Sequence, residues 1–172
     1  MKECPELRLV NLVDWQLFGS WTFKSANLTD RVRHSMWMSF VREVENAARV
    51  PYHRLLWCCR RERGEQTNRL HFHSLIGGLP QRRVHKGTCF QFMRIWECVG
   101  GGHARCRVFN SDAESPDHAI VYPLEGLSGE DFYESGKLNR AQLTLSESVL
   151  RVVRTACSMT DRSLGTDEKR AA

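Results

Sequence analysis

The 172-residue sequence lacks several features that mark whole classes of protein. No apolar run approaches the roughly 20 residues that a membrane-spanning helix needs, so we expect no membrane partner. The stretch Met1–Glu6 contains no apolar signal-peptide segment, which favours a cytoplasmic protein. The sequence has no internal repeats, and it has no Gly-x-x-x-x-Gly-Lys-Ser/Thr loop, which excludes an NTPase site of that type. We expect no attached helicase domain at this length.

The sequence also lacks a cysteine pattern typical of a disulfide framework. The seven cysteines are odd in number and show no Cys-x-x-Cys spacing. Cys58 and Cys59 are adjacent, so in a strand their side chains would point to opposite faces. We therefore expect reduced thiols that mostly fill the core rather than a disulfide framework.

The composition has an excess of positive charge. The formal net charge is +5 and the isoelectric point is about 9.0, which favours an anionic partner. The length suits one domain with a proper core. We assign residues 1–157 to that domain and expect residues 158–172 to form a polar, disordered tail.

A long amphipathic helix is predicted from Asp30 to about Arg49, after a strand predicted for residues 17–25. Apolar side chains recur every three or four residues in this helix, as in a helix with one buried face. Asn27 or Thr29 is the expected N-cap, and Pro51 ends the helix. We expect its charged side chains to lie mainly on the solvent face: Arg31, Arg33, Arg42, Glu43 and Glu45.

The remaining segments suggest a mixed fold. Strands at about residues 54–62 and 69–77 flank a polar, glycine-bearing stretch and form a predicted hairpin. Thr88 is the expected N-cap of a short helix, residues 103–109 alternate as a strand does, and Ser146 can cap a last helix. This pattern predicts the α+β class: an antiparallel β-sheet of about five strands with helices packed on its faces.

The second hairpin strand contains a pair of histidines that we interpret as a metal site. His71 and His73 are two residues apart, so they share one face of the strand. Folding of the hairpin brings Glu62 or Glu65 towards them. Two imidazoles and a carboxylate fit Mg²⁺ or Mn²⁺ in a phosphoryl-transfer site, and they also fit the facial triad of a non-haem iron oxygenase. The pair can also be exposed polar decoration without a ligand.

Three stretches together resemble the HUH endonucleases, specifically the rolling-circle replication initiator (Rep) proteins of plasmids, phages and small single-stranded DNA viruses. Leu70-His71-Phe72-His73-Ser74-Leu75 is similar to the paired-histidine metal motif, and Trp21-Thr22-Phe23-Lys24 to the first strand of the family. Tyr122 follows an apolar stretch where the family has its nucleophilic tyrosine. The resemblance covers about residues 17–137 and gives Glu62 the place of the acidic third ligand.

The resemblance implies an endodeoxyribonuclease that nicks and rejoins single-stranded DNA through a covalent 5′-phosphotyrosine and so initiates rolling-circle replication. It also implies Mg²⁺ or Mn²⁺ as cofactor, and an origin DNA, a host helicase and a host polymerase as partners. The sequence departs from the family after Tyr122, because Pro123 follows directly and Glu125 stands where a lysine is usual. Tyr133, with Lys137 four residues later, is the second candidate nucleophile. Tyr52 completes the three tyrosines of the chain.

Basic side chains near the histidines in the sequence are expected to follow the DNA backbone, with aromatic side chains stacking on bases. A non-catalytic nucleic-acid-binding module is the alternative function, because it fits the charge and the α+β pattern without a metal. The predicted nucleic-acid-binding residues are Arg60, Arg61, Arg63, Arg69, Arg82, Arg83 and Lys86.

Overall fold

The described parts of the chain hold most of the predicted elements. The computed structural model describes residues 13–63, 69–110, 143–152 and 155, with the backbone alone at residues 62, 63 and 143–145. The predicted tail at residues 158–172 lies outside the described residues, and so does the boundary proposed at residue 157.

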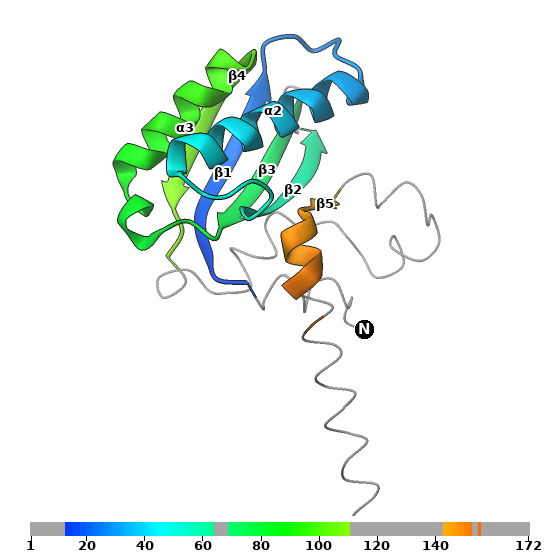
Figure 1. Cartoon of the computed structure of the whole chain (residues 1–172). Helices are drawn as coiled ribbons and strands as arrows, with labels where there is room; N and C mark the ends of the chain where they lie inside the picture. The colour runs from blue at the N-terminus through cyan, green and yellow to red at the C-terminus, as the bar shows by residue number, and fades with distance from the viewer. Residues whose placement is uncertain (1–12, 64–68, 111–142, 153–154, 156–172) are drawn as a thin grey trace, which may run out of the picture.

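Five strands form one antiparallel sheet in the order β4-β1-β3-β2-β5 (Figure 1). This confirms the predicted α+β class and the hairpin of β2 and β3, while β5 was not predicted. The fourth strand starts at the glycines of residues 101 and 102 rather than at residue 103. The strands are β1 (Trp15–Phe23), β2 (Leu56–Arg63), β3 (Leu70–Gly77), β4 (Gly101–Val108) and β5 (Leu143–Leu145).

The first long helix, α2, covers Asp30–Ala48, within one residue of its predicted bounds. Thr29 is its N-cap, because its side-chain oxygen accepts a hydrogen bond from the Val32 backbone N–H at 3.3 Å. The expected solvent face is wrong for two charged side chains, since Arg33 and Glu45 are 8% and 3% exposed. Both residues border the apolar face of α2 that packs against the sheet, and the neighbouring elements therefore bury their side chains.

The second helix, α3, covers Lys86–Cys98 and follows a 3-10 turn at Gln81–Arg83. Its N-cap is His85, so the prediction that Thr88 caps this helix is wrong. Thr88 is instead buried inside the first turn, where its hydroxyl lies 3.3 Å from His85 Nε2. Both α2 and α3 cover the same face of the sheet (Figure 1).

An aromatic core fills the space between this face and the two helices. Trp21, Trp37 and Trp96 are almost fully buried, and their rings contact one another at centroid distances of 5.9 to 6.4 Å. Two of the indoles satisfy their polar edge, because Trp21 Nε1 donates to Ser74 Oγ and Trp96 Nε1 donates to the Thr22 carbonyl, each at 2.8 Å. These contacts fix β1 and β3 against the helices and so position the opposite face of the sheet.

The described cysteines are all free thiols, and Cys58, Cys59 and Cys89 are buried, as predicted. Within the ranges that the structure describes, no helix has the length and apolar character needed to cross a membrane.

Candidate metal centre and nucleic-acid interface

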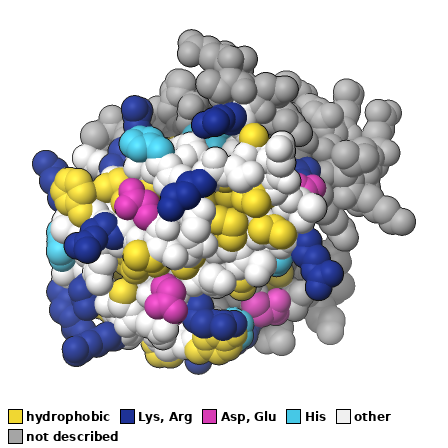
Figure 2. Space-filling view, turned by 90° about the horizontal axis from the view of Figure 1, so that it is seen from above, with side chains coloured by type: hydrophobic (Ala, Val, Ile, Leu, Met, Phe, Trp, Pro, Cys, Tyr) yellow, Lys and Arg dark blue, Asp and Glu magenta, His cyan; other side chains and the backbone are white. Residues whose placement is uncertain are grey.

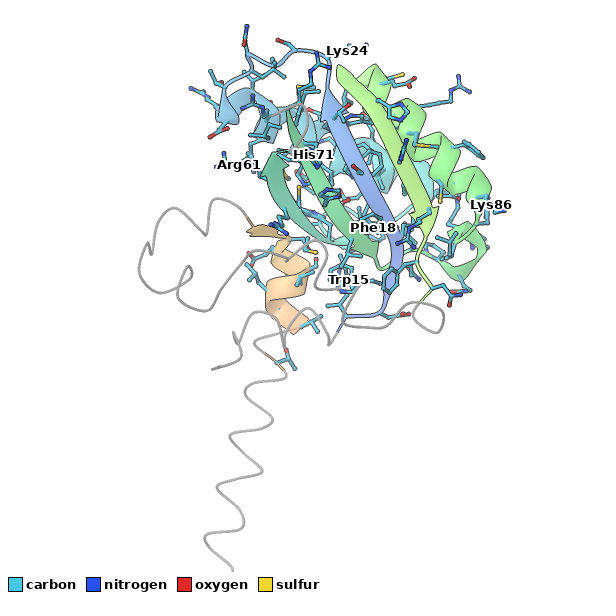
Figure 3. All side chains as sticks on the ribbon, turned by 180° about the vertical axis from the view of Figure 1, so that it is seen from behind. Trp15, Phe18, Lys24, Arg61, His71 and Lys86 are labelled. Carbon is cyan, nitrogen blue, oxygen red and sulfur yellow. The ribbon has the colours of Figure 1, made fainter. Side chains whose placement is uncertain are left out.

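The candidate site lies on the sheet face opposite α2 and α3. Side chains alternate between faces along β3. Phe72 packs into the aromatic core against Trp37, so its neighbours His71 and His73 point away from the helices. Figure 3 shows this face, with His71 near the middle of the sheet. The prediction that the two histidines share one face of the strand is confirmed.

The two imidazoles converge on one point. The Nε2 atoms of His71 and His73 are 2.9 Å apart. His71 Nδ1 lies 3.3 Å from the Arg69 carbonyl oxygen, which can only accept, so this nitrogen carries the proton. The lone pair of His71 is therefore on Nε2 and faces His73. This tautomer is the one that a metal-binding imidazole needs when its other nitrogen is held by a carbonyl.

His73 is held more tightly than His71. It is 5% exposed, and its ring stacks on Phe18 of β1 with 5.9 Å between centroids and 25° between planes. Burial, then the adjacent His71, then the Arg60 guanidinium lower the pKa of His73 to about 4. His73 is thus a neutral imidazole near pH 7, and a neutral imidazole is the form that binds a cation.

The backbone of Glu62, the predicted third ligand, lies directly across the hairpin from His71. In the strand register, Glu62 pairs with His71 and Arg60 pairs with His73. Directly paired residues of antiparallel strands share one face. The side chain of Glu62 and the whole of Glu65 lie outside what the structure describes. Among described side chains, no group of three or more His, Cys, Asp or Glu residues is placed to hold a metal ion.

The two described nitrogens fit a shared divalent ion. Nitrogen–metal bonds of about 2.1 Å at a right angle separate two nitrogens by about 3 Å, close to the observed 2.9 Å. Both Nε2 lone pairs are available together only when neutral His73 has its proton on Nδ1. The observed spacing equally suits a hydrogen bond from His73 Nε2 to His71 Nε2 in the metal-free protein.

The predicted basic residues are divided among separate places. Arg60 is 8% exposed and lies opposite His73, while Arg69 is exposed directly before β3. Arg61 points to the other side of β2, where its guanidinium lies 2.6 Å from the Asp30 carboxylate. Asp30 also contacts Arg33, and the hydrogen bond from Arg61 is the main cause that lowers the pKa of Asp30. The side chain of Arg63 lies outside the description.

The basic turn after β3 lies away from the histidines. Six residues of extended strand separate His71 from Gly77, which is about 20 Å. Arg82 and Lys86 are exposed there, whereas Arg83 donates to the Ala47 carbonyl at 2.8 Å. Arg61 lies at the β2 edge of the sheet and Lys86 lies at the far edge, beside α3 (Figure 3). On the face seen from above, Lys and Arg side chains are scattered and do not form one patch (Figure 2).

Sequence reasoning missed a basic row on β4. Ser20 of β1 pairs with both His73 and Arg105, and Phe18 pairs with Arg107. The exposed side chains of Arg105 and Arg107 therefore lie on the histidine face. Arg107 also covers the Phe18 ring at 4.9 Å from its centroid. The signal was present, because basic side chains alternate at positions 103, 105 and 107 of a predicted strand.

The candidate nucleophiles are not all visible. Tyr122, Tyr133 and Lys137 lie outside the described residues. Tyr52 is 61% exposed in the turn before β2, where its ring contacts His53. That turn adjoins the end of β2 that pairs with Gly77, so Tyr52 is distant from His71.

Comparison with known proteins gives little beyond this geometry. No protein-family model matches the chain, and no curated protein does. Among solved structures, the N-terminal nuclease domain of non-structural protein 1 of minute virus of mice is similar at 12% identity and a TM-score of 0.36. The match covers 82% of this chain and 70% of that one. That domain is described with Zn²⁺ coordination in its active-site pocket and DNA recognition at the origin of replication.

Proposed function

We propose that this chain is a metal-dependent endonuclease that nicks and rejoins single-stranded DNA at a replication origin and so initiates rolling-circle replication. The observation that carries the proposal is the pair of imidazoles, whose Nε2 atoms are 2.9 Å apart on the sheet face opposite α2 and α3. The resemblance of the motif around His71 and His73 to the HUH endonucleases supports the same function.

His71, His73 and Glu62 would hold the ion, which we take to be Mg²⁺ or Mn²⁺. The register supports Glu62 over Glu65, because Glu62 is paired with His71. A bound divalent ion would polarise the scissile phosphate and favour in-line attack. The low pKa of His73 keeps this imidazole neutral near pH 7, and the carbonyl contact of His71 orients the other ring.

Basic side chains on both sides of the histidines support a DNA substrate. Arg60 lies next to His73 on β2, and Arg105 and Arg107 lie on β4 beyond β1. Guanidinium groups hold phosphates by paired hydrogen bonds. Phe18, between β3 and β4, is half-buried and presents an aromatic surface beside the site. Together they form a strip suited to a single strand.

The chemistry needs a tyrosine from the region beyond residue 110. The tyrosine oxygen forms a bond to phosphorus, the bond to the 3′ oxygen breaks, and the tyrosine proton is released while a 3′-OH is formed. The phosphotyrosine keeps the 5′ end and conserves the bond energy for rejoining. Tyr122 is our first candidate and Tyr133, with Lys137 one helical turn away, is the second.

A covalent-adduct assay tests this proposal. The protein is incubated with a pool of single-stranded oligonucleotides and Mn²⁺, and a slower, EDTA-sensitive band is expected on a denaturing protein gel. Tyr122→Phe should remove the band, and loss with Tyr133→Phe instead would identify the other tyrosine. His71→Ala and His73→Ala should lower adduct formation at least a hundredfold while DNA binding persists.

His34→Ala is the matched control, because His34 is an exposed histidine of α2, on the side of the sheet opposite His71 and His73. It should leave adduct formation nearly unchanged. Tight DNA binding without any adduct, over a pool that includes all short sequence contexts and several divalent metals, would favour the non-catalytic binding module.

A further inference from the structure

A separate cavity lies at the C-terminal half of α2, on the side of the sheet opposite the histidines. It is bounded by α2, by the turn and first residues of β2, and by residues 146 and 147. Its volume is about 250 Å³. Sites for drug-sized ligands occupy about 300 to 1,000 Å³, so this cavity suits a smaller ligand or a single side chain.

Glu45 is the unusual residue of this cavity. It lines the cavity although it is only 3% exposed. Within the described part of the chain, its carboxylate makes no hydrogen bond and no ion pair. The carboxylate oxygens of Glu45 are not fully buried and reach the cavity. A carboxylate in such a restricted space gains from a cation beside it. An unpaired acid in a lined cavity therefore indicates a missing cationic partner.

The position of Glu45 in its helix makes the need for a cation stronger. Glu45 lies in the last turn of α2, and this turn contains no basic residue. The carbonyl end of a helix carries partial negative charge, which disfavours a carboxylate and favours a cation. Arg83 already donates to the Ala47 carbonyl at this helix end. The group that lacks a cation here is therefore the Glu45 side chain.

The walls of the cavity determine the kind of cation. Met38, Leu55 and Trp57 give it apolar surface that suits a hydrocarbon stem. Arg42 and Glu147 also line the cavity, are exposed and carry opposite charges, and the exposed His34 and His53 line it too. Glu45 is the one nearly buried charged residue of this lining. One carboxylate is too few for Ca²⁺ or Mg²⁺, which need about six oxygen ligands or a strong water shell.

We infer that this cavity binds an organic cation, an ammonium or guanidinium group on an aliphatic stem, with Glu45 as its counter-ion and the apolar wall around its stem. Such a group can come from a free diamine or from a lysine or arginine side chain of a polypeptide. The inference does not depend on the metal centre, because the two sites occupy opposite faces of the sheet.

Calorimetric titration of the full-length protein tests the inference with putrescine, N-acetyl-lysine amide and N-acetyl-arginine amide, and with 1-butanol as the uncharged control. We expect saturable binding of at least one cation and none of the alcohol. Glu45→Gln keeps the shape of the side chain and should weaken cation binding at least tenfold, as expected for a hydrogen bond to a charged group. Tighter binding of a capped amino acid would identify a polypeptide source, and tighter binding of putrescine a free diamine.

Glu43→Gln makes the same chemical change at an exposed position of the same helix and should leave binding unchanged. Amide NMR shifts of the wild-type protein give a second test if Glu45→Gln fails to fold. Cation binding should move the signals of Leu55 and Trp57 but not that of Phe92 in α3. Equal affinity of wild-type protein and a folded Glu45→Gln variant, or no saturation by any cation at millimolar concentrations, would overturn the inference.

Discussion

Two adjacent cysteines show how strongly burial sets the chemistry of a single residue. Cys58 is fully buried on the histidine face of β2, and burial raises the pKa of its thiol to about 12. Burial also raises the pKa of Cys59 well above its usual value. Cys98 lies at the exposed end of α3. The thiolate is the reactive form, so these residues should differ in their rate of alkylation.

We predict that iodoacetamide at mildly alkaline pH modifies Cys98 rapidly and leaves Cys58 and Cys59 unmodified in the folded protein. A pKa change from 9.0 to about 12 lowers the thiolate fraction of Cys58 about a thousandfold. Peptide mass spectrometry over time gives the three rates. The three should become similar in guanidinium chloride, and fast modification of Cys58 without denaturant would show that β2 opens.

At the residue scale, the sequence predicted the part of the site that depends on local structure. The shared face of His71 and His73 follows from the two-residue period of a strand, and the place of Glu62 follows from one hairpin. The alternating basic side chains of β4 are visible in the sequence, but the position of Arg107 beside the site depends on β4 pairing with β1 and could not be predicted. Glu45 was missed for another reason, because helical periodicity does not show how far neighbouring elements extend over a charged position.

Glycines set the distance between elements at the start of β4. A Cβ atom at position 101 would lie 2.2 Å from the Trp96 indole of α3, which is buried and held by its bond to Thr22. We predict that Gly101→Ala lowers the free energy of unfolding by about 1–3 kcal/mol, as overpacking of a core does. Urea unfolding followed by tryptophan fluorescence measures this change.

Gly87→Ala, within α3, is expected to change the free energy of unfolding in the opposite direction. There the added Cβ would meet only the His85 side chain at 3.0 Å, which can move, and alanine is preferred to glycine in a helix by about 0.5–1 kcal/mol. The variant should be as stable as the wild type or more stable. Equal destabilisation by both substitutions would show that the Trp96 contact is not the cause.

The elements themselves were predictable to different degrees. The bounds of α2 came within one residue because its apolar period and the capping by Thr29 are both local. The start of α3 was missed because His85 caps through its backbone, without a side-chain hydrogen bond. β4 begins at residue 101 because the glycines there make room for Trp96, which no local pattern shows. The strand order depends on distant pairings and was not predicted.

At the scale of the whole molecule, metal binding should appear as added stability. If His71 and His73 hold a divalent ion, Mn²⁺ at one hundred times its dissociation constant adds about 2.7 kcal/mol to the free energy of unfolding. For a chain of this size that corresponds to a rise in Tm of about 5–10 °C. Differential scanning calorimetry should show this rise, and excess EDTA should reverse it.

The double variant His71→Ala/His73→Ala should lose the response to Mn²⁺, while His34→Ala should keep it. An unchanged Tm in the wild type at millimolar Mn²⁺ would contradict the proposed metal centre, even if DNA binding is strong. The test is independent of the nucleophile, so it separates the ion site from the rest of the mechanism.

The strand order also has a consequence for how the chain acquires its structure during synthesis. β1 is the first strand to be made, yet both of its neighbours, β3 and β4, are made after α2. β1 therefore stays unpaired until β3 and β4 have been made. By contrast, α2 and the β2–β3 hairpin can form from contacts between nearby residues. Closure of the sheet around β1 is the late and slow event, because it joins distant segments. The paired histidines can thus be set in place by their hairpin before Phe18 and the arginines of β4 arrive beside them.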